Sequence, residues 1–453
     1  MLQPKRQLNL TQTSSIIIGQ VIGSGIFINV PIVAHIAGSP FIAVLIWFLG
    51  GLIWIPQIMI LAEMGTAYPD QGGPYHYIHK AGSPFLAFMY TWTAFLTSDT
   101  PTLTIIGLLA ADALSYFFPS LIDPLQAKIF AAVMIIAFSA LQYRSVKTGS
   151  NVQVFLTISK LLPLIAVILI GIFFLNSGNL SGFSVFQTAE GESINWGIIT
   201  AGIAATVWAY AGFLNILYTA GEVKNPTKVL PKAMIGSVLF VMAAYILVSL
   251  FTSAIVPFNE LIAVEEGKFI NPFAYLPNIS IYAGALFAVA VFISMLGVMN
   301  SSVITQPRLP FAMARDGLFF KTFGHLHPKF LTPDYSIIIQ GIFAIVLFSI
   351  GDLGDLLGYF TLSYVLQNLL VYASIFSLRR KADYKPVYKS PAWMFMAVFS
   401  VLVQLYLAYG TIMAFPLGGL LACITLILTG LPFYFYFQKR RKDGMVFQNT
   451  DEQ

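Results

Sequence analysis

Twelve long apolar segments follow one another along the chain and are separated by shorter polar stretches. They lie near residues 10–37, 39–66, 85–117, 124–142, 150–175, 194–220, 231–256, 278–304, 334–351, 354–377, 391–413 and 416–438. Each is long enough to cross a bilayer as an α-helix, which requires about 20 residues. The pattern therefore predicts an all-α membrane protein with twelve transmembrane helices and with both termini on one side.

The basic residues agree with this division. Of the 24 Lys and Arg residues, all but Lys128, Lys160 and Lys268 fall on the side that holds the two termini. Because positive charges are retained on the inner side of membranes, this side is predicted to be cytoplasmic. The net charge of +5 therefore reflects topology and does not call for a nucleic acid partner. We expect a multi-pass protein of the cell inner (plasma) membrane, with the lipid bilayer as its surroundings.

The first apolar segment is interrupted near its middle by Gly23, Ser24 and Gly25. Glycine is a poor interior helix former, and irregular backbone at membrane depth is tolerated where it is buried in protein or lines a cavity. A break here would end one half-helix near Ile22 and begin another near Ile26. The carbonyl groups of the first half suit an ammonium group, and the N–H groups of the second suit a carboxylate. The alternative is a simple kink or a close helix contact.

A second interruption is predicted in the sixth segment, where Trp208 to Phe213 read Trp-Ala-Tyr-Ala-Gly-Phe. The first and sixth segments each begin a unit of five spans. Because five is odd, the two units would enter the membrane from opposite sides. Interrupted helices at matching places in two inverted units are the best sequence indication of a transporter binding site.

Several motifs resemble the amino acid–polyamine–organocation superfamily. The stretches 19–27, 68–77, 221–231 and 312–333 match its first helix and its loops after spans 2, 6 and 8 in order. Asn300, Arg308 and the second break resemble the L-amino acid transporter branch, and most closely its bacterial alanine–serine–cysteine exchangers. Leu214 departs from the asparagine of the animal members, so their side-chain selectivity is not carried over.

The resemblance implies a LeuT-type fold with two inverted five-helix repeats, in which helices 1 and 6 are broken. The first repeat would cover residues 1–176 and the second 177–380. Spans 11 and 12 would follow over 381–438, with a cytoplasmic tail over 439–453. Animal members of the branch carry a cysteine before span 4 that tethers a heavy subunit. The only cysteine here is Cys423, in the last apolar segment, so no disulfide-linked heavy subunit is expected.

The resemblance also implies a substrate site at the two breaks. Ser24 and Gly25 would donate backbone N–H groups to the carboxylate of an amino acid, and Gly23 would allow close approach. The carbonyl groups of Val21, Trp208 and Ala211 would accept the α-ammonium group. The Trp208 side chain would cover the substrate unless it only packs in the core. The remaining residues of the predicted site are Ile22, Ala209 and Phe213.

Neither break contains a charged side chain, which favours small neutral amino acids as substrates. The branch resembles sodium-independent exchangers, and a proton-coupled symporter is the alternative. A membrane enzyme would need a catalytic constellation, and the sequence shows none. It also shows no nucleotide loop, no metal motif and no need for a cofactor.

Lys160 is the only basic residue assigned to the interior of a predicted span, away from its ends. It lies nine residues after Asn151, or about 14 Å along the helix, near the middle of a core of about 30 Å. A lysine so deep must find acceptors or a counter-ion. The resemblance implies that it replaces a cation between spans 1 and 8, where it would bind carbonyl groups of the first half-helix and the Ser294 hydroxyl. The alternatives are a direct pair with Asp99 or a wet cytoplasmic cavity.

Two of the acidic residues in the predicted spans carry a specific expectation. Asp99, in the third segment, is a functional candidate by its depth. Neighbouring threonine and serine residues or a wet vestibule could equally account for it. Glu63, near the cytoplasmic end of the second segment, is expected to be an interfacial charge.

Overall fold

The structure is a computed structural model that describes residues 3–23, 25–176, 178–181, 193–264, 269–276, 280–349, 353–414 and 417–442. The named elements of these residues are all helical, and Leu8 and Val223 form an isolated β-bridge. The first group of helices is α1 (Leu10–Val21), α2 (Gly25–Ala37), α3 (Pro40–Leu52), α4 (Trp54–Ala67), α5 (Gly73–Ala81), α6 (Pro84–Thr93), η1 (Ala94–Asp99), α7 (Thr100–Leu114), η2 (Pro119–Ile122), α8 (Pro124–Arg144) and α9 (Val146–Phe174).

The second group begins after the stretch 182–192, which lies outside the described residues. It consists of α10 (Trp196–Thr206), η3 (Phe213–Glu222), α11 (Pro226–Ile255), α12 (Phe258–Ile262), η4 (Pro272–Tyr275), η5 (Ser280–Tyr282), α13 (Ala283–Thr305), α14 (Arg308–Arg315), η6 (Lys321–Gly324), α15 (Asp334–Leu347), α16 (Leu353–Leu378), α17 (Trp393–Ala414), α18 (Leu417–Leu428) and α19 (Gly430–Lys442).

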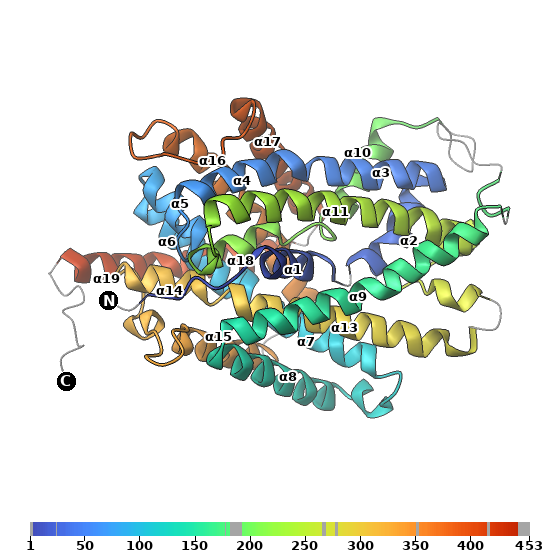
Figure 1. Ribbon diagram of the computed structural model, residues 1–453, viewed down its shortest axis with the longest axis horizontal. Helices are drawn as coiled ribbons and strands as arrows, with labels where there is room; N and C mark the ends of the chain where they lie inside the picture. Colours follow the sequence, from blue (N-terminus) through green and yellow to red (C-terminus); the bar gives the residue numbers. More distant parts are fainter. Residues whose placement is uncertain are drawn as a thin grey trace.

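The axes of the long helices lie roughly along one line. Figure 1 shows α3, α4, α9, α11 and α13 running along the long axis of the molecule, with the start of the chain and α19 at the same end. Helix α11 packs against α1, α3, α4 and α9, and α13 packs against α1, α7 and α9. These two helices therefore hold α1 in the interior.

The apolar helices establish a multi-pass membrane protein. In the described part of the chain seven helices are long and apolar enough to cross a membrane, or eight if the bent pair α1 and α2 counts as one span. Helices α10 and α15 are apolar but shorter. Each of the twelve predicted segments contains helix. The count of twelve spans and the repeat boundaries at residues 176 and 380 remain predictions.

Both predicted interruptions are present. Helix α1 ends at Val21, α2 begins at Gly25, and their axes are bent by 49°. Helix α10 ends at Thr206, and irregular backbone over residues 207–212 leads into η3. Gly212 has a φ of 115°, in the left-handed region that glycine adopts without steric strain. The second half of this segment is a 3₁₀-helix, which the apolar pattern did not predict.

Two further features differ from expectation. A π-helical turn, η1, widens the third segment at Ala94–Asp99. Glu63 is fully buried and does not lie at an interface, so the prediction for this residue was wrong. Arg379 donates to both of its carboxylate oxygens at 2.7 and 2.6 Å, and the Ser390 N–H donates to Oε2 at 2.7 Å. This ion pair ties α4 to the end of α16.

Candidate functional site

Lys160 of α9 holds the end of α1. Its ammonium group donates to the carbonyl oxygen of Gly19 at 2.7 Å and also to that of Ile22. The side chain is 1% exposed. The last carbonyl groups of a helix have no partner within the helix and carry partial negative charge, so a buried cation stabilises them. The predicted contact between Lys160 and the first half-helix is thus present.

The expected contact between Lys160 and Ser294 is absent. Ser294 Oγ is buried and has no hydrogen-bond partner in the described part of the chain. Helix α13 instead approaches the lysine through Gly297, where an added Cβ would lie 3.3 Å from Nζ. Among the described residues Lys160 forms no ion pair with Asp99, and its two hydrogen bonds go to the last turn of α1 and to Ile22 directly after it. The carbonyl groups of the half-helix therefore take the place of a counter-ion.

Tyr245 of α11 joins the two interruptions. Its hydroxyl lies 3.3 Å from the carbonyl oxygen of Val21 and 3.0 Å from that of Ala209, so its single proton has two acceptors within reach. The ring packs against Trp47 and Tyr210, with centroid distances of 5.3 and 5.0 Å. A single phenol group therefore sets the spacing between the end of α1 and the irregular backbone after α10.

The backbones of the two interruptions lie in direct contact. A Cβ added to Gly25 would lie 2.9 Å from Cα of Ala209, closer than real Cβ contacts allow. A Cβ on Gly212 would lie 2.8 Å from Cγ of Gln20. At Gly23, an added Cβ would lie 3.2 Å from the Val298 side chain. Glycine is thus required for this close approach, which is one of its recognised uses.

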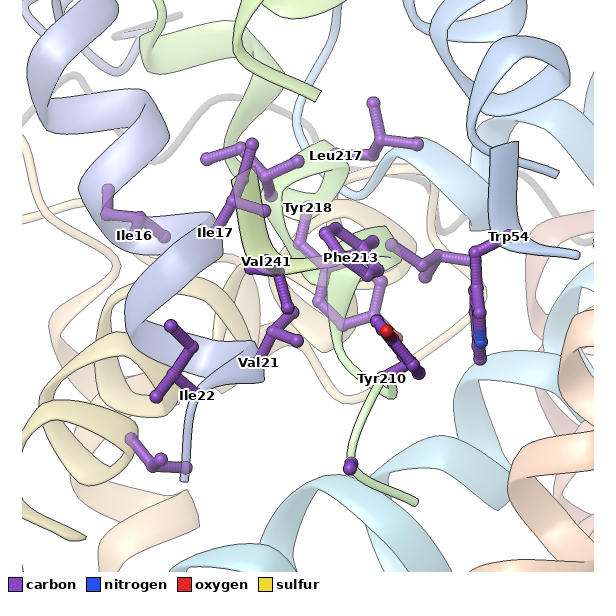
Figure 2. Packing of buried hydrophobic residues seen from close by; sticks show 14 of the residues in the cluster. Ile16, Ile17, Val21, Ile22, Trp54, Tyr210, Phe213, Leu217, Tyr218 and Val241 are labelled. Carbon is purple, nitrogen blue, oxygen red and sulfur yellow. The ribbon is translucent and has the colours of Figure 1, made fainter. Parts of the chain in front are cut away.

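The structure brings most of the predicted substrate residues together. Figure 2 shows Val21 and Ile22 at the end of α1, with Tyr210 and Phe213 of the second interruption and Trp54 of α4 nearby. Phe213 is fully buried and packs on Trp54 at 6.0 Å between ring centroids. Trp208 is half-buried. Ser24 lies outside the described residues.

Two of the three carbonyl groups predicted to bind the α-ammonium group already accept one hydrogen bond. The Val21 oxygen accepts from Tyr245, and the Trp208 oxygen accepts from the Ala211 N–H at 3.3 Å. A carbonyl oxygen has two lone pairs and can in general accept a second donor. The Ile22 oxygen, in contrast, is bonded to Lys160. Lys160 thus binds the Gly19 and Ile22 oxygens, whereas the Val21 oxygen between them in sequence is bonded to Tyr245.

Polar contacts inside the bundle fix the surrounding helices. Asn300 of α13 donates to Gln153 Oε1 at 2.7 Å and accepts from Gln142 Nε2 at 2.8 Å. Gln153 in turn donates to the Ser15 carbonyl oxygen of α1 at 3.3 Å. Buried amide groups that are bonded in this way favour one arrangement of helices. Helices α1, α8, α9 and α13 are therefore held together independently of Lys160.

Polar contacts join neighbouring elements near the N-terminal segment. Arg308 Nε donates to Glu222 Oε1 at 2.9 Å, and both side chains are buried. Burial raises the pKa of the Tyr75 phenol, and the Asp316 carboxylate raises it further. Tyr75 therefore keeps its proton at neutral pH and donates to Asp316 Oδ2 at 2.9 Å. These bonds connect η3 with α14 and α5 with the residue after α14.

Sequence reasoning missed Tyr245. Its segment reads as a uniformly apolar span, and a single tyrosine there is consistent with ordinary core packing. The available signal was a hydroxyl group at membrane depth, which needs a hydrogen-bond partner. Which carbonyl groups it would meet depends on helix packing that the sequence pattern does not specify.

We expect Tyr245→Phe to lower the apparent affinity for substrate by about tenfold, because the single phenol proton available to the two carbonyl groups is lost. Tyr210→Phe is the matched control. Tyr210 belongs to the same aromatic cluster, but its hydroxyl donates to the Trp47 carbonyl oxygen of α3 at 3.0 Å. Competition of unlabelled substrate against labelled uptake measures both variants. An equal effect of the two substitutions would show that Tyr245 only packs.

The described residues contain no group of three or more His, Cys, Asp or Glu side chains that could hold a metal ion. The groups described at the two interruptions are backbone N–H and carbonyl groups, the Lys160 side-chain amine and the Tyr245 phenol. Opposite helix ends at one place suit a ligand that carries both an ammonium and a carboxylate group.

Comparison with known proteins agrees with this geometry. The family model described as amino acid permease matches residues 8–434. The serine/threonine exchanger SteT of Bacillus subtilis is 29% identical over 446 residues, covering 96% of this chain and 98% of that protein. The mouse b(0,+)-type amino acid transporter 1 is 28% identical, covering 96% of this chain and 88% of that protein. The human cystine/glutamate transporter is 28% identical, covering 96% and 86%. The chain is therefore a member of the amino acid permease family of membrane transporters, within the amino acid–polyamine–organocation superfamily.

Proposed function

We propose that this transporter exchanges small neutral L-amino acids of the alanine, serine and cysteine type by sodium-independent alternating access. The contact between the two interruptions is the observation that carries the proposal. There, the carbonyl end of α1 lies beside the irregular backbone that follows α10. This placement offers an ammonium-binding end and a carboxylate-binding end to one zwitterion.

The proposed binding mode follows the polarity of the two helix ends. The N–H groups of Ser24 and Gly25 bind the carboxylate, and Gly23 allows its approach. The carbonyl groups of Val21, Trp208 and Ala211 bind the α-ammonium group, and the Trp208 side chain covers the substrate. Ile22, Ala209 and Phe213 complete the wall. The absence of a charged side chain from residues 19–27 and 207–213 favours neutral substrates.

Exchange is favoured over proton-coupled symport by the name of the Bacillus subtilis relative, which describes an exchanger. Independence from sodium is supported by Lys160, whose side-chain nitrogen bonds to carbonyl oxygens at the end of α1, where the resemblance places a cation in sodium-coupled relatives. We further propose a plasma membrane location with both termini cytoplasmic, from the distribution of basic residues. We expect no disulfide-linked subunit, because Cys423 is the only cysteine.

We expect uptake of labelled alanine into proteoliposomes to rise strongly when the interior is preloaded with unlabelled alanine or serine. An exchanger returns to its starting state only with substrate bound, so empty vesicles should take up little. Replacing sodium with potassium in both compartments should leave the rate unchanged. Equal uptake into empty vesicles, growing with an imposed pH gradient, would establish the proton symporter instead.

A further inference from the structure

A groove of about 860 Å³ lies between α8 and α15, a volume that suits a bound molecule rather than one or two waters. Helix α8 forms the lower edge of the molecule in Figure 1, and α15 packs beside it. Of the seven long apolar helices in the described part of the chain, α8 is the least buried. The lining includes no residue of the two interruptions, so the groove is separate from the proposed substrate site.

Small residues open the groove, and larger apolar side chains form its walls. Ala137 and Ala140 of α8 line it and are exposed. On α15, Gly341 lies so close to α8 that an added Cβ would be 3.1 Å from Ser139 Oγ. Isoleucine side chains of both helices complete the lining, among them Ile342, which is 53% exposed. The body of the groove is therefore an open apolar channel on the surface of the helix bundle.

One end of the groove is polar and basic. Arg144, the last residue of α8, lines it together with Ser145 and Thr148 at the start of α9. Arg144 and the nearby Lys147 are exposed, and among the described residues neither forms an ion pair. Arg144 follows the predicted span that ends near residue 142, so its guanidinium group lies at the depth of lipid head groups.

The loop beside this end adds positive charge. Tyr143, which lines the groove, packs on Phe330 at 6.0 Å between ring centroids, and the Lys329 ammonium group lies 5.6 Å from the centroid of Phe330. The Asp334 carboxylate at the start of α15 is buried, and it lies 2.7 Å from His325 Nδ1. The residues that line the groove include no acidic side chain. The exposed charge at this end is therefore positive.

The combination of an apolar channel and a basic end defines the chemistry of the ligand. A guanidinium group binds phosphate oxygens in a bidentate manner. A free phosphate ion would leave the apolar channel empty, and a zwitterionic lipid would bring a cationic group close to Arg144 and Lys147. A lipid with a net negative head group matches both parts. Basic pockets between transmembrane helices on the cytoplasmic side are suited to such head groups, and this end lies on the side predicted to be cytoplasmic.

We propose that the groove between α8 and α15 binds an anionic phospholipid of the surrounding bilayer. Its phosphate group lies against Arg144, and one acyl chain follows Ala140, Ala137 and Ile342 toward the middle of the membrane. This site goes beyond the proposed transport function and does not depend on it.

The test titrates the detergent-purified protein with phosphatidylglycerol or with phosphatidylcholine of identical acyl chains. Native mass spectrometry gives the affinity for the first bound lipid. We expect the wild-type protein to bind phosphatidylglycerol at least about fivefold more tightly than phosphatidylcholine. Arg144→Gln should weaken binding of phosphatidylglycerol by about fivefold, because one positive charge near the membrane surface is lost. Ala140→Trp should fill the groove and abolish this binding while it keeps every charge.

Lys232→Gln and Ala243→Trp are the matched controls, because both residues are exposed on α11 and neither lines the groove. Both controls should bind phosphatidylglycerol as the wild-type protein does. Size-exclusion chromatography reports whether each variant folds, and either groove variant suffices if the other does not.

Three results would overturn the inference, and none of them bears on transport. The first is equal affinity of the wild-type protein for the two lipids. The second is unchanged binding of phosphatidylglycerol in a folded groove variant, which would place the lipid elsewhere. The third is a dimer in the same spectra that is lost in Ala140→Trp, which would show that a second copy of the chain occupies the groove.

Discussion

Substitution of Gly25 by valine is expected to abolish substrate binding and uptake. A Cβ at this position would lie 2.9 Å from Cα of Ala209, and the contact is with backbone that cannot move aside as a flexible side chain can. Valine adds two further methyl groups to that Cβ. The two interruptions would have to separate, and the N–H groups at the start of α2 would no longer face the other half of the site.

Three measurements make this prediction specific. Gly236→Val is the matched control, because a Cβ at Gly236 of α11 would meet nothing within 4 Å. Ser24→Ala should be much milder than Gly25→Val, since we propose that Ser24 acts through its backbone. Elution as a single species on size-exclusion chromatography reports whether each variant folds. Near wild-type affinity in folded Gly25→Val would rule out the proposed close contact as a requirement for binding.

The positions of the two interruptions could be predicted because they depend on local chemistry. Gly23 and Gly25 disfavour helix wherever they occur in an apolar run, and the observed end of α1 at Val21 lies one residue from the expected one. The second interruption was less strongly indicated by one glycine, yet it lies where expected. The family was likewise recognisable from loop motifs that are contiguous in sequence.

Contacts between distant segments could not be predicted in the same way. The Glu63 carboxylate is buried because Arg379 and the Ser390 N–H, more than 300 residues away, supply its donors. The sequence of α4 alone shows only an acidic residue near the end of a predicted span. Similarly, the joining role of Tyr245 and the missing bond to Ser294 depend on how α11 and α13 are rotated about their axes. Helix rotation is set by packing with neighbours, which periodicity describes only in part.

The environment of Lys160 could be predicted in part from the sequence and depends in part on contacts between distant segments. Its depth was evident from the sequence, and the end of α1 was a predicted acceptor. The structure supports this choice over a pair with Asp99, because the ammonium group bonds to the Gly19 and Ile22 carbonyl oxygens. It does not support the alternative of a lysine in a wet cavity, since the side chain is 1% exposed. We propose that this charge holds the end of α1 against α9 during part of the transport cycle.

We expect Lys160→Ala to reduce exchange by at least about tenfold, because hydrogen bonds to a charged group contribute about 1.5–3 kcal/mol each and two are lost. Lys160→Met tests the charge with less change in volume and should show a similar loss. Lys147→Ala, at an exposed position near the start of α9, should leave exchange unchanged. The readouts are counterflow into proteoliposomes and apparent affinities measured from each side of the membrane. If Lys160 stabilises one state of α1 over another, the difference between the inside and outside affinities should change in both variants. Folded Lys160→Ala with unchanged exchange and unchanged affinities on both sides would refute this role.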